Sequence, residues 1–147
     1  YSKIREISDK LKKPVPLLRE LLKCSKNKFT LFIEIKPNLS KYLLKKLLKE
    51  TSDYKKCVFI SFNHKNIYNL LRIKKNIKVG LSYAPPTSVK KIVKTSTNKN
   101  IDCLILDKYF IRNKNIQNLK IDKYYYTIKN KSEFIKFAKN NLIFENL

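Results

Sequence analysis

The most constraining feature of this sequence is a regular alternation between short apolar segments and segments with apolar residues at helical spacing. Six apolar segments recur at intervals of roughly 20 to 27 residues, the length of a βα unit. Each of the first five is followed by a helical or connecting segment. This alternation indicates an α/β protein with a parallel sheet. The predicted strands cover residues 31–36, 58–62, 77–83, 101–106, 124–128 and 142–144.

Apolar residues at helical spacing also predict the helices. A short helix is expected within residues 2–11, and a leucine-rich helix begins next to Pro16. Ser40 is expected to cap the helix that follows the first strand, and Ser132 the last helix. Residues 111–119 are rich in Asn and weakly periodic, so they predict only a shortened helix.

The length, hydrophobic content and net charge of the chain are typical of a globular protein with a basic surface. With 147 residues and 43% hydrophobic content, the chain is expected to form one domain over residues 1–147. The net charge of +23 makes nucleic acid, anionic membranes and anionic small substrates possible partners. The basic residues are spread over every segment, which is typical of solvated faces.

The three cysteines, Cys24, Cys57 and Cys103, have no metal-ligand spacing, and their odd number argues against a disulfide framework. Buried free thiols in a reducing compartment are the simplest interpretation. No apolar run is long enough to span a membrane, and no signal peptide opens the chain, which begins at Tyr1. We therefore expect a cytoplasmic protein without a membrane span.

The first predicted strand carries two charges at its carboxyl end. Alternation along a strand places Glu34 and Lys36 on one face, about 7 Å apart, just before Pro37. Parallel α/β proteins place their catalytic groups at this end of the strands. The alternative is an exposed ion pair on an edge strand.

The chain contains a single glycine, Gly80, which excludes the glycine-rich phosphate loops of dinucleotide-binding and P-loop proteins. A nucleotide-binding Rossmann domain is therefore disfavoured. Two architectures fit the pattern of strands. One is a TIM (β/α)8-type barrel that lacks its first two units, and the other is an open six-stranded sheet.

Six segments resemble, in order, motifs of the glycerophosphodiester phosphodiesterase family. Residues 32–36, Phe-Ile-Glu-Ile-Lys, resemble its Asn-Ile-Glu-Ile-Lys strand. Residues 60–64, Ile-Ser-Phe-Asn-His, resemble its Ser-Ser-Phe-Asn/Asp-His segment, and residues 125–129 resemble Val-Trp-Thr-Val-Asn. The remaining matches lie at residues 16–22, 79–84 and 141–147. The order and spacing of the matches extend the resemblance over essentially the whole chain.

The resemblance implies an incomplete TIM barrel with about six βα units, the carboxyl-terminal part of a phospholipase-C-like phosphodiesterase. It implies metal-dependent hydrolysis of glycerophosphodiesters to glycerol 3-phosphate and an alcohol, with Mg²⁺ or Ca²⁺ as cofactor. On this resemblance Glu34 is a metal ligand and Lys36 a catalytic contact to the phosphate. Phe62 and Tyr126 are expected to bind the substrate, although core packing is the alternative for both.

The departures from the family concern the catalytic machinery. The family's two catalytic histidines and its other two metal carboxylates lie upstream of the matched segments. The only histidine here, His64, matches a non-catalytic position and is expected to be structural or exposed. The chain is therefore expected to be inactive as it stands, with a small glycerophosphodiester as the substrate of the complete site.

Two further hypotheses remain. A truncated barrel without turnover could act as an interaction module, because its two open strand edges favour self-association. A basic nucleic-acid-binding protein is suggested by the charge and by residues 124–126, Tyr-Tyr-Tyr. Consecutive strand residues face opposite sides and cannot form one stacking platform, so we expect no nucleic-acid partner.

Overall fold

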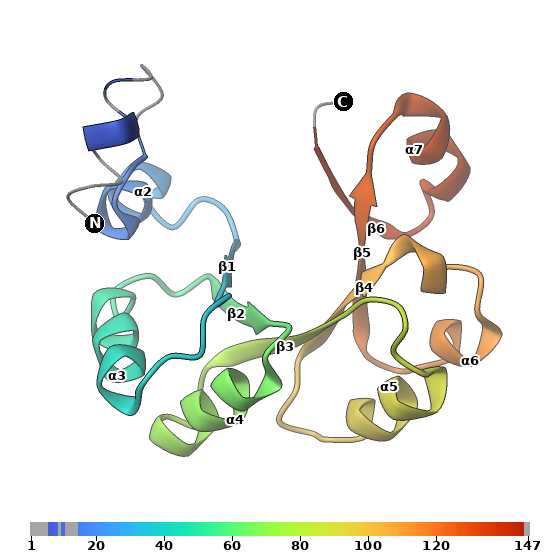
Figure 1. The fold of residues 1–147 in the computed structure, drawn as a ribbon, viewed down its shortest axis with the longest axis horizontal. Coiled ribbons are helices and arrows are strands. Elements are labelled where there is room, and N and C mark those ends of the chain that lie inside the picture. Colours follow the sequence, from blue (N-terminus) through green and yellow to red (C-terminus); the bar gives the residue numbers. More distant parts are fainter. Residues whose placement is uncertain (1–5, 9, 11–14, 146–147) are drawn as a thin grey trace.

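A computed structural model describes residues 6–8, 10 and 15–145 and contains the predicted alternation of strands and helices (Figure 1). Six parallel strands form one sheet in the order β1 to β6, with helices between successive strands. The strands are β1 (Leu31–Glu34), β2 (Cys57–Ser61), β3 (Lys78–Tyr83), β4 (Cys103–Asp107), β5 (Asp122–Ile128) and β6 (Asn141–Phe144). The helices are α2 (Leu18–Ser25), α3 (Lys41–Glu50), α4 (His64–Ile73), α5 (Val89–Ser96), the 3₁₀ turn η1 (Lys108–Phe110), α6 (Lys114–Gln117) and α7 (Lys131–Phe137).

The sheet is curled like part of a barrel. Each strand pairs in parallel with the next one along the chain. In a flat sheet of this order, β1 and β5 would lie about 19 Å apart, four strand spacings. Instead the rings of Phe32 on β1 and Tyr124 on β5 meet at 4.9 Å between centroids. The predicted incomplete barrel is therefore confirmed, and the open-sheet alternative is wrong.

Two apolar layers follow from alternation along the strands. The larger layer lies between the sheet and the surrounding helices (Figure 1) and includes Leu44, Ile67, Leu81 and Leu104. The smaller layer fills the inside of the curl. It consists of Val58, Ile60, Cys103 and Ile105, with Phe32, Tyr124, Tyr126 and Ile143 packed against them.

Of the two helix N-caps predicted from the sequence, the structure contains one. Ser40 Oγ accepts a hydrogen bond from the Leu43 N–H at 3.3 Å, as predicted. The prediction of Ser132 as a cap is wrong, because Asn130 caps α7 by accepting from the Glu133 N–H at 2.9 Å. Both residue types favour this position, and Asn130 has the extended backbone that a cap requires.

The remaining predictions on helices, thiols and membrane spans have mixed outcomes. Residues 111–119 contain only the four-residue α6, as the weak periodicity indicated. The predicted helix at residues 2–11 falls mostly outside the described residues. Cys57 and Cys103 are buried free thiols, whereas Cys24 is exposed. In the part of the chain that the structure describes, no helix has the length and apolarity needed to cross a membrane.

Gly80 is needed where β3 approaches its neighbours inside the curl. A Cβ atom added at this position would lie 2.6 Å from Cys103 Sγ and 3.2 Å from Ile60 Cγ2. We expect Gly80→Ala to lower the free energy of unfolding by about 1–3 kcal/mol, the usual effect of overpacking. Urea denaturation measures this change.

Ser82→Ala is the matched control, because Ser82 lies on the same strand two residues further on. Its Oγ is buried without a hydrogen-bond partner among the described residues. Removing it should leave stability within about 0.5 kcal/mol or raise it. Equal losses in the two variants would contradict the account of Gly80.

Candidate active site

Glu34 is the last residue of β1 and lies exposed at the carboxyl end of the strand. The strand ends two residues earlier than predicted, although the Ile35 N–H still donates to the Ile60 carbonyl at 2.8 Å. Lys36 lies beyond the strand and is exposed. Strand alternation therefore does not fix the direction of the Lys36 side chain, and its placement on one face with Glu34 stays a prediction. Pro37 lacks an N–H and cannot extend the ladder.

The loop after β1 is held by two polar side chains from the next βα unit. The amide of Asn66, fully buried on α4, donates to the Pro37 carbonyl at 2.7 Å and accepts from the Leu39 N–H at 3.1 Å. Ser61 Oγ donates to the Ile35 carbonyl. Sequence reasoning missed both residues. A polar residue beside Ile67 on the apolar stripe of α4 was the available signal for Asn66.

Phe62 and Tyr126, the two residues predicted to bind substrate, lie in contact. Phe62 directly follows β2 and is 48% exposed, and its ring meets that of Tyr126 edge to face at 5.9 Å. The Tyr126 hydroxyl donates to the Tyr83 carbonyl at 2.8 Å. Phe62 after β2 and Tyr126 on β5 thus form an aromatic wall at the carboxyl end of the sheet, and the Tyr83 carbonyl at the end of β3 holds the Tyr126 hydroxyl.

Two carboxylates act on Tyr126. Burial raises the pKa of Tyr126 to about 12, and the negative charges of Asp107 and Glu34 act in the same direction. Asp107 is the last residue of β4 and pairs in register with Tyr126. Glu34 and Asp107 therefore share the carboxyl end of the sheet with the aromatic wall. Sequence reasoning missed Asp107, although a carboxylate directly after the apolar run of residues 103–106 was a usable signal.

A hollow of about 470 Å³ opens beside this wall, between the loops after β2 and β3. Phe62 and His64 line it, together with Lys65, Lys91 and Ser82. The Ser82 side chain is 2% exposed, and its Oγ has no hydrogen-bond partner among the described residues. Two ammonium groups and a spare hydroxyl are donors that suit an anion. Glu34 and Lys36 lie outside the lining of this hollow.

His64 has structural contacts. Its Nε2 lies 3.0 Å from the Ser82 carbonyl oxygen, and its ring packs edge-on against Tyr83 at 4.7 Å. Burial lowers the pKa of His64 from the ordinary 6.5; the hydrogen bond to Ser82 opposes this, and the nearby charge of Lys91 adds to it. These contacts agree with the structural role expected for this residue.

The lowered pKa of His64 predicts how stability changes with pH. Between the folded and unfolded pKa values the unfolded chain binds more protons, so the free energy of unfolding rises with pH. The contribution of His64 is complete above 6.5, its unfolded pKa, and is lost as pH falls through the lower folded value. We expect His64→Gln to flatten this slope in urea denaturation below about pH 6.5. An unchanged slope in the variant would assign it to other groups.

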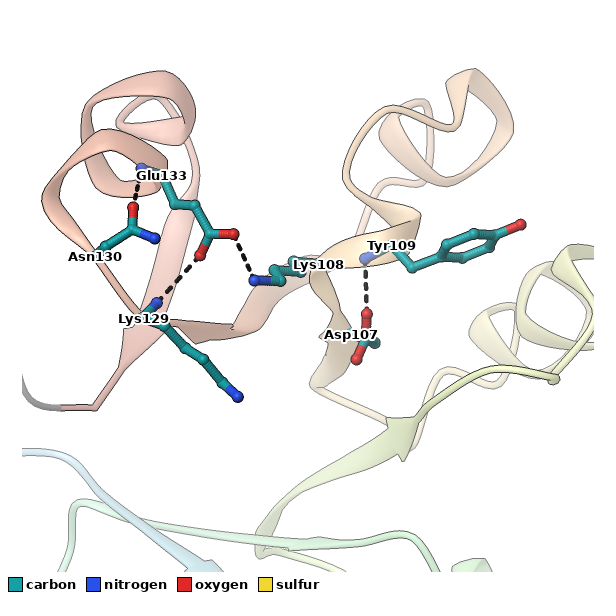
Figure 2. A network of polar contacts seen from close by, with 6 residues as sticks. All are labelled: Asp107, Lys108, Tyr109, Lys129, Asn130 and Glu133. Carbon is teal, nitrogen blue, oxygen red and sulfur yellow. Dashed lines mark hydrogen bonds and ion pairs between the residues drawn. The ribbon is translucent and has the colours of Figure 1, made fainter.

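A polar network fixes the loops after β4 and β5 (Figure 2). Glu133 Oε1 pairs with Lys108 Nζ, and its Oε2 accepts from the Lys129 N–H at 3.1 Å. These two contacts lower the pKa of Glu133. Asp107 Oδ1 accepts from the Tyr109 N–H at 2.8 Å, which orients this carboxylate at the start of η1.

Comparison with known proteins rests on structure alone, because the sequence matches no protein-family profile and no curated protein. The chain superposes on a glycerophosphodiester phosphodiesterase from Thermotoga maritima with a TM-score of 0.71 at 16% identity, covering 95% of this chain and 64% of that one. A phosphodiesterase from Oleispira antarctica, in complex with the product sn-glycerol-3-phosphate, gives a TM-score of 0.74 at 17% identity, with coverages of 89% and 57%. The glycerophosphodiester phosphodiesterase from Agrobacterium tumefaciens gives 0.64 at 14%, with coverages of 91% and 59%.

This chain has the fold of an incomplete glycerophosphodiester phosphodiesterase barrel. The resemblance inferred from the sequence is therefore confirmed at the level of fold. The chain spans between 53% and 64% of the lengths of these and three similar solved structures.

The residues of this chain fit a divalent metal only in part. Glu34 is an exposed carboxylate that makes no hydrogen bond with other described residues, so both of its oxygens are available as ligands. Mg²⁺ and Ca²⁺ require six or more oxygen ligands, usually from several groups. Among the described residues, no three His, Cys, Asp or Glu side chains are placed to hold one ion. The described residues therefore do not form a complete metal centre.

Proposed function

We propose that this chain is the carboxyl-terminal part of a metal-dependent phosphodiesterase that hydrolyses glycerophosphodiesters to glycerol 3-phosphate and an alcohol. Residues 1–147 act in this proposal as one domain of the complete enzyme. The supporting observation is the position of Glu34, a carboxylate with free oxygens at the carboxyl end of a barrel-type strand. In barrels of this type, catalytic residues come from the carboxyl ends of several strands.

In this proposal, Glu34 contributes one ligand to Mg²⁺ or Ca²⁺, and the remaining ligands come from two further βα units. Lys36 contacts a phosphate oxygen and stabilises charge that develops on it. The wall formed by Phe62 and Tyr126 contacts the glycerol moiety. The Oleispira antarctica structure supports this assignment of ligand class, because that protein holds sn-glycerol-3-phosphate on a similar fold.

Binding of sn-glycerol 3-phosphate to the purified chain tests the proposal without requiring turnover. We expect an NMR titration to shift the backbone amide signals of Glu34, Phe62 and Tyr126. Lys36→Gln should weaken binding by roughly three- to tenfold, the effect of one exposed charge contact. Lys28→Gln is the matched control, because Lys28 is also exposed but precedes β1 at its opposite end.

Two results would contradict the assignment. One is an equal loss of affinity in the Lys28→Gln and Lys36→Gln variants, because binding would then reflect overall charge. The other is a saturable titration whose shifts avoid the carboxyl ends of the strands. In that case the ligand would occupy a different part of the molecule.

A second candidate function, a non-catalytic interaction module, is favoured by the two open edges of the sheet. Both β1 and β6 have only one neighbouring strand among the described residues. Free strand edges pair readily with other strands. In this alternative the chain associates with itself or with another polypeptide through β1 and β6, and Glu34 and Lys36 are surface charges.

A further inference from the structure

A hollow surrounded by lysines lies at the opposite end of the barrel from Glu34. Its volume is about 580 Å³, within the range of small-molecule sites. It is formed by the segments that lead into β2, β3 and β4, so it opens at the amino-terminal face of the sheet. Buried side chains, among them Tyr54 and Phe59, form its floor. The five lysines around it are Lys55, Lys74, Lys75, Lys78 and Lys99.

These lysines are exposed, and none of their ammonium groups makes an ion pair or hydrogen bond with another described residue. The one carboxylate in the lining is that of Asp102. It accepts a hydrogen bond from the Val79 N–H at 2.8 Å, near the first residue of β3. Lys123, at the same end of the sheet, differs from these lysines because its ammonium group is hydrogen-bonded to the backbone. Its Nζ donates to the carbonyls of Leu119 and Ile121 at 2.7 and 3.2 Å.

Helix dipoles reduce the positive charge of this hollow but do not cancel it. Helices α3 and α4 end beside it, and each carboxyl-terminal end carries about half a negative charge. Together with Asp102 they offset about two of the five lysine charges. A local excess of about three positive charges therefore surrounds a concave surface.

The hollow continues on both sides. A neighbouring hollow of about 400 Å³ shares Lys75 and Asn100 with it and adds Arg72. Another of about 470 Å³ shares Lys99 and Asp102 and adds Lys120 and the carboxylate of Asp122, so its net charge is close to zero. An elongated ligand with several charges can contact Lys75 and Lys99 together with the lysines of the central hollow, which a single phosphate is too small to do.

We propose that the amino-terminal face of this barrel binds a linear condensed phosphate at Lys74, Lys75 and Lys99. Lysine ammonium groups are point charges that suit phosphate oxygens from several directions. The neutral side chains of Ser52, Asn76 and Asn100, also in the lining, can donate further hydrogen bonds. The proposal is independent of the site at Glu34, because the two lie at opposite ends of the strands.

Isothermal titration calorimetry of the purified chain with tripolyphosphate tests the proposal. We expect saturable binding with one ligand per chain and weaker binding of inorganic phosphate. The triple variant Lys74→Gln, Lys75→Gln and Lys99→Gln should lose roughly tenfold or more in affinity. The triple variant Lys45→Gln, Lys46→Gln and Lys90→Gln is the control. It removes the same charge from exposed positions on α3 and α5.

Three outcomes would overturn the proposal. The first is the absence of saturable binding, and the second is an equal loss of affinity in the two triple variants. The third is tighter binding of a short single-stranded RNA that depends on Lys74, Lys75 and Lys99, which would identify a nucleic-acid surface. A shift of backbone amide signals around Lys75 and Lys99 with tripolyphosphate, and none around Glu34, would support it.

Discussion

Turnover of glycerophosphocholine by the isolated 147-residue chain is expected to remain at the uncatalysed rate, with or without Mg²⁺ or Ca²⁺. General acid–base catalysis contributes about 10²- to 10⁴-fold to such reactions. The only histidine in the sequence, His64, lies with its Nε2 3.0 Å from the Ser82 carbonyl oxygen, and burial lowers its pKa, with a smaller effect of Lys91 in the same direction. The described residues also lack a cluster of three metal ligands.

An enzyme-coupled assay for glycerol 3-phosphate measures this, with a complete glycerophosphodiester phosphodiesterase as the positive control. Release that rises with added metal and disappears with a chelator would show that the chain alone carries a complete site. Residues 32–36 would then act with ligands from the chain that the present account does not assign.

Self-association of the isolated chain is the second large expected effect. The N–H groups of Leu31 and Ile35 donate to the carbonyls of Lys56 and Ile60, on the β2 side, so alternation directs those of Phe32 and Glu34 to the free edge. At the other end of the sheet, the Glu145 N–H donates to the Ile128 carbonyl, which directs the Phe144 N–H outward. We expect the chain to form dimers or larger species that grow with concentration in sedimentation velocity experiments.

The variant Phe144→Pro removes this outward N–H, and Phe144→Ala is its control. Both variants lose the contact between the rings of Phe144 and Phe134, but only the proline loses the donor. We expect the proline variant to raise the dissociation constant of the dimer on the order of tenfold above that of the alanine variant. A monomer at all concentrations, or equal effects in the two variants, would contradict pairing through this edge.

The fold could be predicted from the sequence because its signals are local and repeated. The apolar run of residues 101–106 and the helical stripe at Ile67 and Leu70 each indicate one element, and their alternation indicates a parallel sheet. The curl was harder to predict, because the contact between Phe32 and Tyr124 joins strands four places apart in the sheet. Only the resemblance to a family favoured a barrel over an open sheet.

In the candidate site, the residues placed by alternation within one strand could be predicted from the sequence. The contacts between residues of different βα units could not. Alternation correctly placed Phe32 inside the curl and Ile35 in the layer under the helices. It does not extend to Lys36, because β1 ends at Glu34 and the loop beyond it is held by the hydrogen bonds of Asn66. The position of Asp107 after an apolar run was a local signal, but its proximity to Tyr126 depends on the pairing of β4 with β5, and no local pattern indicates the buried hydroxyl of Ser82.

The most direct test is a chain in which the first two βα units of the Thermotoga maritima enzyme precede residue 1, assayed for metal-dependent release of glycerol 3-phosphate. We predict that Glu34→Gln lowers the rate of this extended chain by about 10²- to 10³-fold and raises the metal concentration needed. Glu50→Gln, which changes an exposed carboxylate at the far end of α3, should have little effect. Full metal-dependent turnover in the Glu34→Gln variant would contradict the assignment of Glu34 and the proposed function built on it.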